Sequence, residues 1–189
     1  MHPFAQPMSA PIRHVTVYCA SSQNLDRAYI DAAERLGAAI ARAKLMLVYG
    51  GGSLGLMGAV ADSMHRCGGR VHGVITEKLV AMELARQTCD ELEIVATMRL
   101  RKQRMEELAD AFITLPGGVG TYEELFEMLV ARKFHDHDKP LIVVNVNNYF
   151  RPLLAMLQRG VDEGFLQPAT RDLLTFVSAP EEAVERLTG

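Results

Sequence analysis

The stretch AFITLPGGVGTYEELFEML, Ala111 to Leu129, joins a strand-like apolar run to a helical pattern through a glycine-rich loop. Pro116 ends the expected strand, and Gly117, Gly118 and Gly120 follow it. Glycines in such a loop cost conformational entropy unless another group must come close to the main chain. Because a helix start offers free N–H groups and a positive dipole end, we expect an anionic group to bind over this loop.

Thr121 and Glu124 allow a second interpretation of the same loop. They form the pattern T-x-x-E, which is typical of a capping box, with Thr121 as the N-cap of the helix. Capping explains the threonine and the glutamate, but it does not explain the glycines. The glycines therefore favour a bound, phosphorylated ligand.

Short apolar runs alternate with helical patterns along the rest of the chain. Runs such as LIVVNV are apolar on both faces, as expected of parallel strands covered by helices on each side. The sequence predicts a doubly wound α/β fold, in which ligands bind at the carboxyl ends of the strands. The expected strands are 14–19, 45–49, 71–75, 92–95, 111–115, 141–146 and 174–177. The expected helices are 26–43, 56–67, 98–109, 121–133, 149–163 and 180–187.

Composition is that of a globular protein, with 49% apolar and 23% charged residues among 189. We expect one domain over residues 12–189, preceded by a short, poorly ordered tail over residues 1–11 that is not a secretory signal. The net charge of -3 argues against a nucleic-acid partner, and no apolar run is long enough to span a membrane. Three scattered cysteines suggest free thiols in a reducing cytoplasm.

One polar loop and one cysteine contain reactive side chains but are not predicted to form a site. The loop FHDHDKP contains His135, Asp136, His137 and Asp138, but it lacks the fixed scaffold and distant third ligand of a metal site. Cys19 has no indicated histidine partner and is expected to be a small core residue. We therefore predict no metal and no cofactor.

A second glycine loop, YGGGSLGLMG, follows the strand expected at 45–49. Gly50, Gly52 and Gly55 match G-x-G-x-x-G, which is found in dinucleotide sites, and Glu77 could then contact a ribose. Tight packing of strand against helix explains the same glycines equally well. Taken together, the loop YGGGSLGLMG and the loop at Gly117–Thr121 predict a phosphorylated ligand held between them.

Arg101 occupies an unusual position in the expected helix 98–109. Met98, Arg101, Met105 and Leu108 fall on one stripe of that helix. Either the guanidinium reaches water while its stem packs, or it points into the ligand cleft, where it could bind a phosphate or carboxylate with two hydrogen bonds. Lys102 could add a second positive charge or be solvated.

These segments together resemble the LOG ("Lonely guy") family of nucleoside 5'-monophosphate phosphoribohydrolases. The family signature, M-x-x-R-K followed by P-G-G-x-G-T-x-x-E, is present at the family's spacing from Met98 to Glu124. The loop YGGGSLGLMG and the segment HDKPLIVVNVNNYFRPLL also match the family. Such proteins often carry the label "lysine decarboxylase", but we find no lysine in a context that would anchor pyridoxal.

The resemblance implies a Rossmann-like, homodimeric enzyme in which water cleaves the N-glycosidic bond of AMP or a cytokinin riboside monophosphate. It assigns catalysis to Arg101 and Glu124 and the phosphate loop to Gly118–Thr121. Glu124 would stabilise the positive charge on the ribose or activate water, and Arg101, which keeps its proton, would hold the phosphate or ribose hydroxyls. The implied substrate-binding residues are Ser21, Gly51, Gly52, Glu83, Arg101, Lys102, Gly117, Gly118, Val119, Gly120, Thr121, Tyr122, Glu123 and Glu124.

The chain departs from the family at Arg99, where a histidine is common, and at Val130–Ala131, where threonine and tryptophan are common. These positions are expected near the base, so the base preference stays open. Two other functions compete with hydrolysis. A nucleotide or cofactor carrier would need the glycine loops but neither Arg101 nor Glu124. An NAD-dependent oxidoreductase would rest on the Gly50–Gly55 match alone and would leave the loop at Gly117–Thr121 unexplained.

Overall fold

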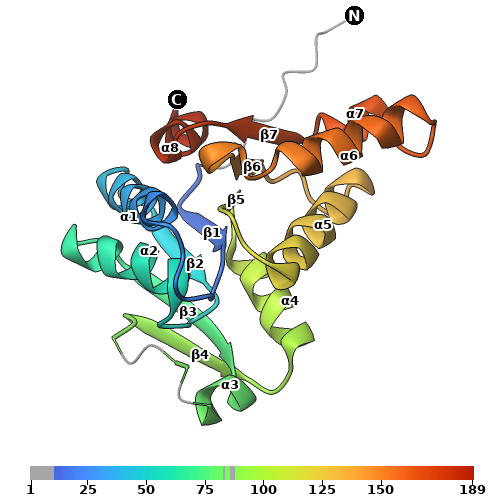
Figure 1. The fold of residues 1–189 in the computed structure, drawn as a ribbon. Helices are drawn as coiled ribbons and strands as arrows, with labels where there is room; N and C mark the ends of the chain where they lie inside the picture. The colour runs from blue at the N-terminus through green and yellow to red at the C-terminus, as the bar shows by residue number, and fades with distance from the viewer. Residues whose placement is uncertain (1–10, 83, 86–87) are drawn as a thin grey trace, which may run out of the picture.

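Seven parallel strands form one sheet in the computed structural model, which describes residues 11–82, 84–85 and 88–189. The strand order is β4-β3-β2-β1-β5-β6-β7, and every pair of neighbours is parallel. The strands are β1 His14–Tyr18, β2 Met46–Tyr49, β3 Val71–Thr76, β4 Glu91–Val95, β5 Ala111–Thr114, β6 Leu141–Val144 and β7 Leu174–Val177 (Figure 1).

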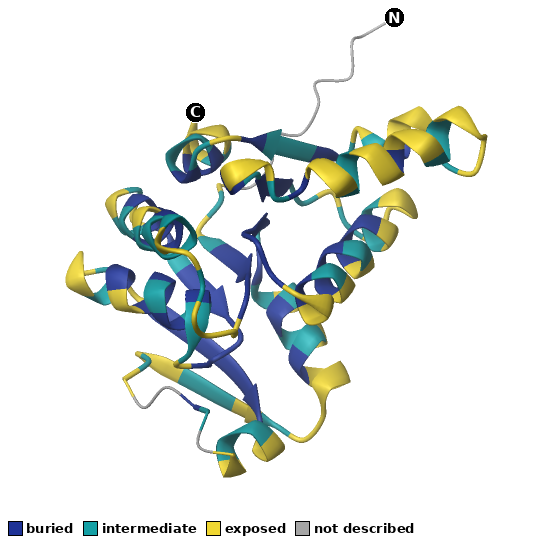
Figure 2. Cartoon of the chain, in the orientation of Figure 1, coloured by how far each residue is buried: buried dark blue, intermediate teal, exposed yellow. Residues whose placement is uncertain are grey.

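Helices cover both faces of this sheet (Figure 1). One face carries α1 Arg27–Arg42, α2 Gly55–Arg66 and α8 Pro180–Thr188; the other carries α4 Met98–Leu108, α5 Val119–Lys133 and α6 Arg151–Asp162. Each face has its own hydrophobic cluster, and successive strand residues alternate between the two because strand side chains point to opposite faces. Figure 2 shows the buried residues along the sheet and the inner sides of the helices.

The predicted α/β architecture is confirmed, and the sheet is wholly parallel. Each expected helix and strand is present, with ends shifted by a few residues at most. Three short elements were missed: α3 Glu77–Ala81, the 3-10 turn η1 Val146–Asn148 and α7 Pro168–Arg171. They are too short for hydrophobic periodicity to reveal them. Residues 1–10 of the predicted tail lie outside the described residues.

The capping box predicted for Thr121 and Glu124 is wrong. Helix α5 begins at Val119, and its N-cap is Gly118, which has extended backbone and makes no side-chain cap. Thr121 and Glu124 therefore lie inside the helix, and both are buried. Glycine can serve as an N-cap, so the helix starts earlier than the T-x-x-E pattern suggests.

Strand order reverses beside β1, which pairs with β2 on one side and β5 on the other. The segments that follow β1 and β5 meet where the Ala20 N–H donates to the Pro116 carbonyl at 3.2 Å. Connections leaving the two strands go to opposite faces of the sheet, which opens a crevice at their carboxyl ends. Within the described chain, no helix is both long and apolar enough to cross a lipid bilayer.

Candidate active site

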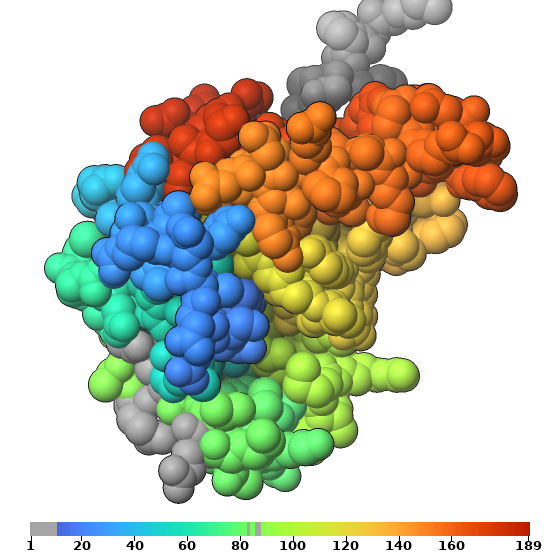
Figure 3. Space-filling view, viewed as in Figure 1, coloured from blue at the N-terminus to red at the C-terminus, as the bar shows by residue number. Residues whose placement is uncertain are grey.

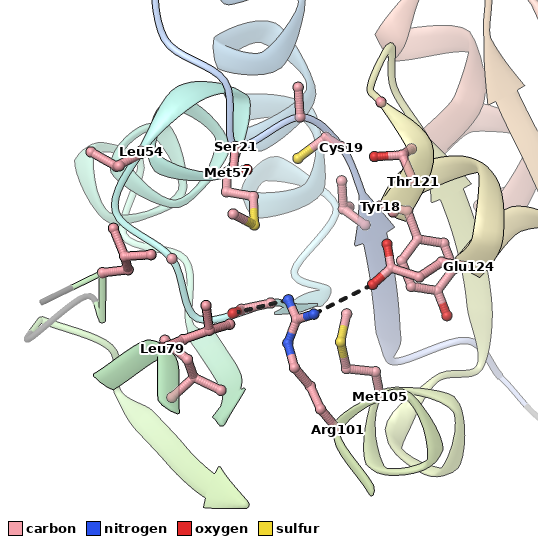
Figure 4. A pocket seen from close by; sticks show the side chains of 18 of the residues that line it. Tyr18, Cys19, Ser21, Leu54, Met57, Leu79, Arg101, Met105, Thr121 and Glu124 are labelled. Atoms are coloured by element: carbon pink, nitrogen blue, oxygen red, sulfur yellow. Dashed lines mark hydrogen bonds and ion pairs between the residues drawn. The ribbon is translucent and has the colours of Figure 1, made fainter. Parts of the chain in front are cut away.

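A cavity of about 440 Å³ lies at the carboxyl edge of the sheet. It is bounded by the segments that follow β1, β2 and β3 and by the first turns of α4 and α5 (Figure 4). In Figure 3, the blue segment after β1 lies beside the yellow start of α5 on this face of the molecule. Its polar lining consists of Tyr18, Cys19, Ser21, Ser22, Ser53, Arg101, Lys102, Thr121, Glu123 and Glu124, together with the backbone of Gly50, Gly52, Gly118 and Gly120.

Arg101 points into the molecule, so the snorkelling interpretation is wrong. The residue is only 7% exposed. Its Nε donates to the Val74 carbonyl at 2.9 Å, and its Nη2 donates to the Gly50 carbonyl at 3.2 Å. These two carbonyls, from β3 and the end of β2, satisfy one side of the guanidinium and leave Nη1 facing Glu124. The planar fork is thereby held in one orientation.

Glu124 comes from the second turn of α5 and meets Arg101 across the cavity. Its Oε1 lies 3.7 Å from Nη1 of Arg101, and the residue is 9% exposed. Burial raises the pKa of the Glu124 carboxyl from 4.5 to about 7; Arg101 acts in the opposite direction and Glu123 adds to the rise. A carboxyl that titrates near neutrality can accept a proton during a reaction, which fits a general base.

The start of α5 presents bare main chain to the cavity. A Cβ on Gly118 or Gly120 would meet no heavy atom within 4 Å, and neither residue has a positive φ. Neither the packing nor the backbone of this chain therefore requires glycine there. The first amides of a helix have no acceptor within it, so this start can bind an anion that comes close to the chain. Gly117 differs, because a Cβ there would overlap the Thr121 side chain.

Packing explains each glycine of the G-x-G-x-x-G match. A Cβ on Gly50 would overlap the Arg101 guanidinium, and one on Gly52 would overlap the Met57 methyl group. Gly55 has a φ of +59° and lies against the backbone of residues 20–22. Of the two interpretations left open for this loop, the structure favours tight packing. Gly50 adds a functional element, since it makes room for Arg101.

One wall of the cavity is apolar, and the sequence analysis did not find it. Figure 4 shows Leu54, Met57 and Leu79 on the side of the cavity away from the start of α5, and these side chains form the wall. Spacing along the chain could not reveal it, because each element contributes only one or two residues. The other apolar side chains that line the cavity are Ile75, Leu84, Met98 and Met105.

Lys102 lines the cavity, but two carboxylates hold its amine. Nζ lies 2.8 Å from Oε1 of Glu123 and 2.9 Å from Oε2 of Glu127, which ties α4 to α5. Cys19 also lines the cavity, and burial raises the pKa of its thiol far above neutrality. A thiol that stays protonated is a poor nucleophile, in agreement with the expectation of a small core residue.

Known proteins match this chain over most of its length. The profile of a family described as "Possible lysine decarboxylase" matches residues 57–187. A cytokinin riboside 5'-monophosphate phosphoribohydrolase of Rhodococcoides fascians is 45% identical over 95% of this chain and 91% of that protein. The enzyme LOG3 of Arabidopsis thaliana, with the same activity in its name, is 41% identical over 93% of this chain and 81% of its own.

The chain belongs to the LOG family. A further relative is the rice protein LOGL2, which is named as a probable enzyme of the same kind. It is 40% identical over 97% of this chain and 75% of the rice protein. Among solved structures, the molybdenum cofactor binding protein of Rippkaea orientalis superposes with a TM-score of 0.70 at 20% identity, covering 95% of this chain and 96% of that one. The molybdenum cofactor carrier of Chlamydomonas reinhardtii gives 0.68 at 17%, covering 93% and 96%. At such identities the likeness shows the fold alone.

Most predicted site residues of the LOG family member meet in this cavity. Ser21, Gly52, Arg101, Lys102, Gly118, Val119, Gly120, Thr121, Glu123 and Glu124 line it. Gly51, Gly117 and Tyr122 are not among the lining residues, and Glu83 lies outside the described residues.

Three other positions named from the sequence lie apart from the cavity. Arg99 and Val130 are exposed and do not line it. Glu77 begins α3 and is exposed. Within the described ranges, no group of three or more histidine, cysteine, aspartate or glutamate side chains is arranged to hold a metal ion.

Proposed function

We propose that this LOG family member hydrolyses the N-glycosidic bond of a nucleoside 5'-monophosphate, releasing the free base and ribose 5-phosphate. The substrate is AMP or a cytokinin riboside monophosphate; the second of these is the substrate in the names of relatives at 41–45% identity. One observation carries the proposal: the buried Arg101–Glu124 pair faces the same cavity as the bare helix start at Gly118–Thr121. A fixed cation, a carboxylate and an anion site then surround one sugar.

The phosphate of the substrate binds at the start of α5. The free amides there and the helix dipole favour an anion, and the absence of side chains at Gly118 and Gly120 lets the phosphate oxygens come close. Glu124 lies one turn further along the same helix and lines the same cavity. The ribose that follows the phosphate therefore reaches the carboxylate.

Glu124 acts on the anomeric carbon of that ribose. Cleavage builds positive charge on the sugar, and a buried carboxylate stabilises that charge strongly. The carboxylate also accepts a proton from the water whose oxygen bonds to the anomeric carbon, while the electrons of the broken C–N bond leave with the base. A pKa of about 7 leaves a large share of Glu124 ionised at neutral pH.

Arg101 holds the sugar and the carboxylate in position. Two of its nitrogens are anchored to the Val74 and Gly50 carbonyls, and the third faces Glu124. Its remaining N–H groups contact ribose hydroxyls rather than the phosphate, because the free amides of α5 serve the phosphate. Arg101 does not protonate the leaving base, since a guanidinium keeps its proton.

The base binds against the apolar wall. A purine ring stacks well on a flexible methionine side chain, and Met57 belongs to this wall, while Met98 and Met105 line other parts of the same cavity. An apolar substituent on the base, such as a prenyl group, gains additional buried area there. The wall therefore supports adenine with or without such a group.

We further propose that the protein is a cytoplasmic homodimer. The three cysteines form no disulfide, which suits a reducing compartment. Val130 on α5 and Phe134 at its C-cap are exposed apolar side chains, which a second copy would cover. Sedimentation equilibrium at several protein concentrations tests the dimer, and a monomeric mass throughout contradicts it.

Release of free adenine tests the proposed reaction. Purified protein is incubated with AMP, with a prenylated AMP and, as a control, with adenosine, and the products are separated by chromatography. We expect adenine or prenyladenine together with ribose 5-phosphate from the two monophosphates, and much less base from adenosine. Tight AMP binding without release of base would favour a nucleotide carrier instead.

A further inference from the structure

The segment after β6 carries a tyrosine to the back of the glycine loop. Asn147 and Asn148 have φ angles of 49° and 58°, a left-handed region that asparagine tolerates better than most residues. This turn brings Tyr149 beside Tyr29 of α1, with the two rings edge to face and their centroids 6.0 Å apart. Such an uncommon backbone indicates that the position of Tyr149 is specified by the fold.

The Tyr149 hydroxyl donates a hydrogen bond to the Gly117 carbonyl at 2.7 Å. The hydroxyl oxygen of Tyr122 lies 2.7 Å from the hydroxyl oxygen of Tyr149. Since a phenol has one hydrogen and a carbonyl only accepts, Tyr122 must donate to Tyr149. Burial, together with the hydrogen bond from Tyr122, raises the pKa of Tyr149 to about 12, so it remains a donor at neutral pH.

The geometry of the peptide bond transmits this contact to the neighbouring residue. In a trans peptide the C=O of one residue and the N–H of the next point in opposite directions. When Tyr149 holds the Gly117 carbonyl, the Gly118 N–H is turned away from Tyr149. Gly118 lines both the main cavity and a smaller one of about 180 Å³, whereas Gly117 and Tyr149 line only the smaller one. No described residue accepts a hydrogen bond from the Gly118 N–H.

We propose that Tyr149 is a positioning residue for the phosphate: through the Gly117 carbonyl it holds the Gly118 N–H toward the ligand cavity. The proposal deepens the proposed function, because it assumes that the ligand carries a phosphate at the start of α5. Without the phenol, the peptide between Gly117 and Gly118 is free to rotate, and the amide is lost from the anion site. The role is selective, since the base wall is built from other elements.

The test compares Tyr149→Phe with Tyr29→Phe. Both remove one hydroxyl from the same pair of edge-to-face rings, but only Tyr149 bonds to Gly117. Binding of ribose 5-phosphate and of adenine is measured by calorimetry, and KM and kcat are measured with AMP. For Tyr149→Phe we expect ribose 5-phosphate affinity to fall about tenfold or more, which corresponds to the loss of one hydrogen bond to a charged group. KM should rise by a similar factor while kcat, adenine affinity and Tm stay near wild type.

Three results would overturn the proposal: unchanged ribose 5-phosphate affinity in Tyr149→Phe, an equal loss in Tyr29→Phe, or an equal loss of adenine affinity. Calorimetry does not depend on turnover. If the wild-type protein binds ribose 5-phosphate but releases no adenine from AMP, the proposed reaction fails while the role of Tyr149 is still tested. If the wild-type protein binds no phosphorylated ligand, both proposals fall.

Discussion

Nη1 of Arg101 lies 3.7 Å from Oε1 of Glu124, although the two residues belong to different helices on the same face of the sheet. Both side chains are buried, and both line the cavity at the carboxyl edge. The desolvation of Glu124 outweighs the attraction of Arg101, which is why the carboxyl titrates near neutrality. The site thus holds a poised carboxylate beside a fixed cation.

Replacement of Glu124 tests its part in the chemistry. Glu124→Gln keeps the shape of the side chain but cannot accept a proton, so we expect adenine release from AMP to fall by about 100-fold or more. Glu127→Gln is the matched control, because Glu127 lies on the same helix and pairs with Lys102 near the surface. That control should stay within about threefold of wild type. Wild-type activity in Glu124→Gln would contradict the assignment.

The pH dependence of kcat/KM should report the ionisation of Glu124. The carboxylate is the active form and its pKa is raised to about 7, so activity should increase as pH rises through that value. An unperturbed glutamate would instead give full activity from about pH 5.5 upward. A profile measured with AMP between pH 5 and 9 distinguishes the two. A flat profile from pH 5.5 to 8 would show that Glu124 does not control the rate.

Stability should change with pH in the opposite direction to activity. Because the folded pKa of Glu124 lies above 4.5, the protonated form favours folding, and its contribution is full below pH 4.5 and is lost as pH rises through about 7. The free energy of unfolding that is lost in this way is at most about 3 kcal/mol. Glu124→Gln cannot ionise, so its Tm should exceed that of wild type at pH 8, with the difference shrinking toward pH 5. A Tm difference that does not vary with pH would contradict this linkage.

Gly50→Ala should displace the Arg101 guanidinium without unfolding the protein. The added Cβ would overlap Nη2, which is the end of a flexible side chain. A shift of about 1 Å in a catalytic group can cost about 100-fold in rate, and we expect a loss of that order in adenine release. Circular dichroism should show a folded protein. Near wild-type activity would mean that Arg101 needs no fixed position.

Alanine at the three glycines of the α5 start should separate binding from stability. At both Gly118 and Gly120 the Cβ enters open space, and ribose 5-phosphate affinity should fall about tenfold or more. Tm should stay level or rise for Gly120→Ala, which lies inside the helix, and should fall slightly for Gly118→Ala, because alanine is a poorer N-cap than glycine. At Gly117 the Cβ overlaps Thr121, so Gly117→Ala should destabilise the fold by about 1–3 kcal/mol. If all three variants lost stability and kept affinity, these glycines would serve packing alone.

Arg101 and Glu124 illustrate how far prediction from the sequence reached. Periodicity placed Arg101 on a buried stripe but could not decide between water and cleft, because the deciding carbonyls of Val74 and Gly50 come from other strands. The T-x-x-E pattern assigned Glu124 to a cap, because local spacing cannot tell that Gly118 starts the helix. The apolar wall had no local signal at all.

Local patterns by themselves determined the α/β alternation, the two glycine loops and the family signature, since strand and helix periodicity and turn chemistry depend on residues close in the chain. Tertiary structure alone decided which groups meet: the guanidinium against Glu124, Leu54 with Met57 and Leu79 along one wall, and Tyr149 behind Gly117. The physical reason is that the parallel sheet brings the carboxyl ends of β1, β2, β3 and β5 to one edge, where side chains distant in sequence share one cavity.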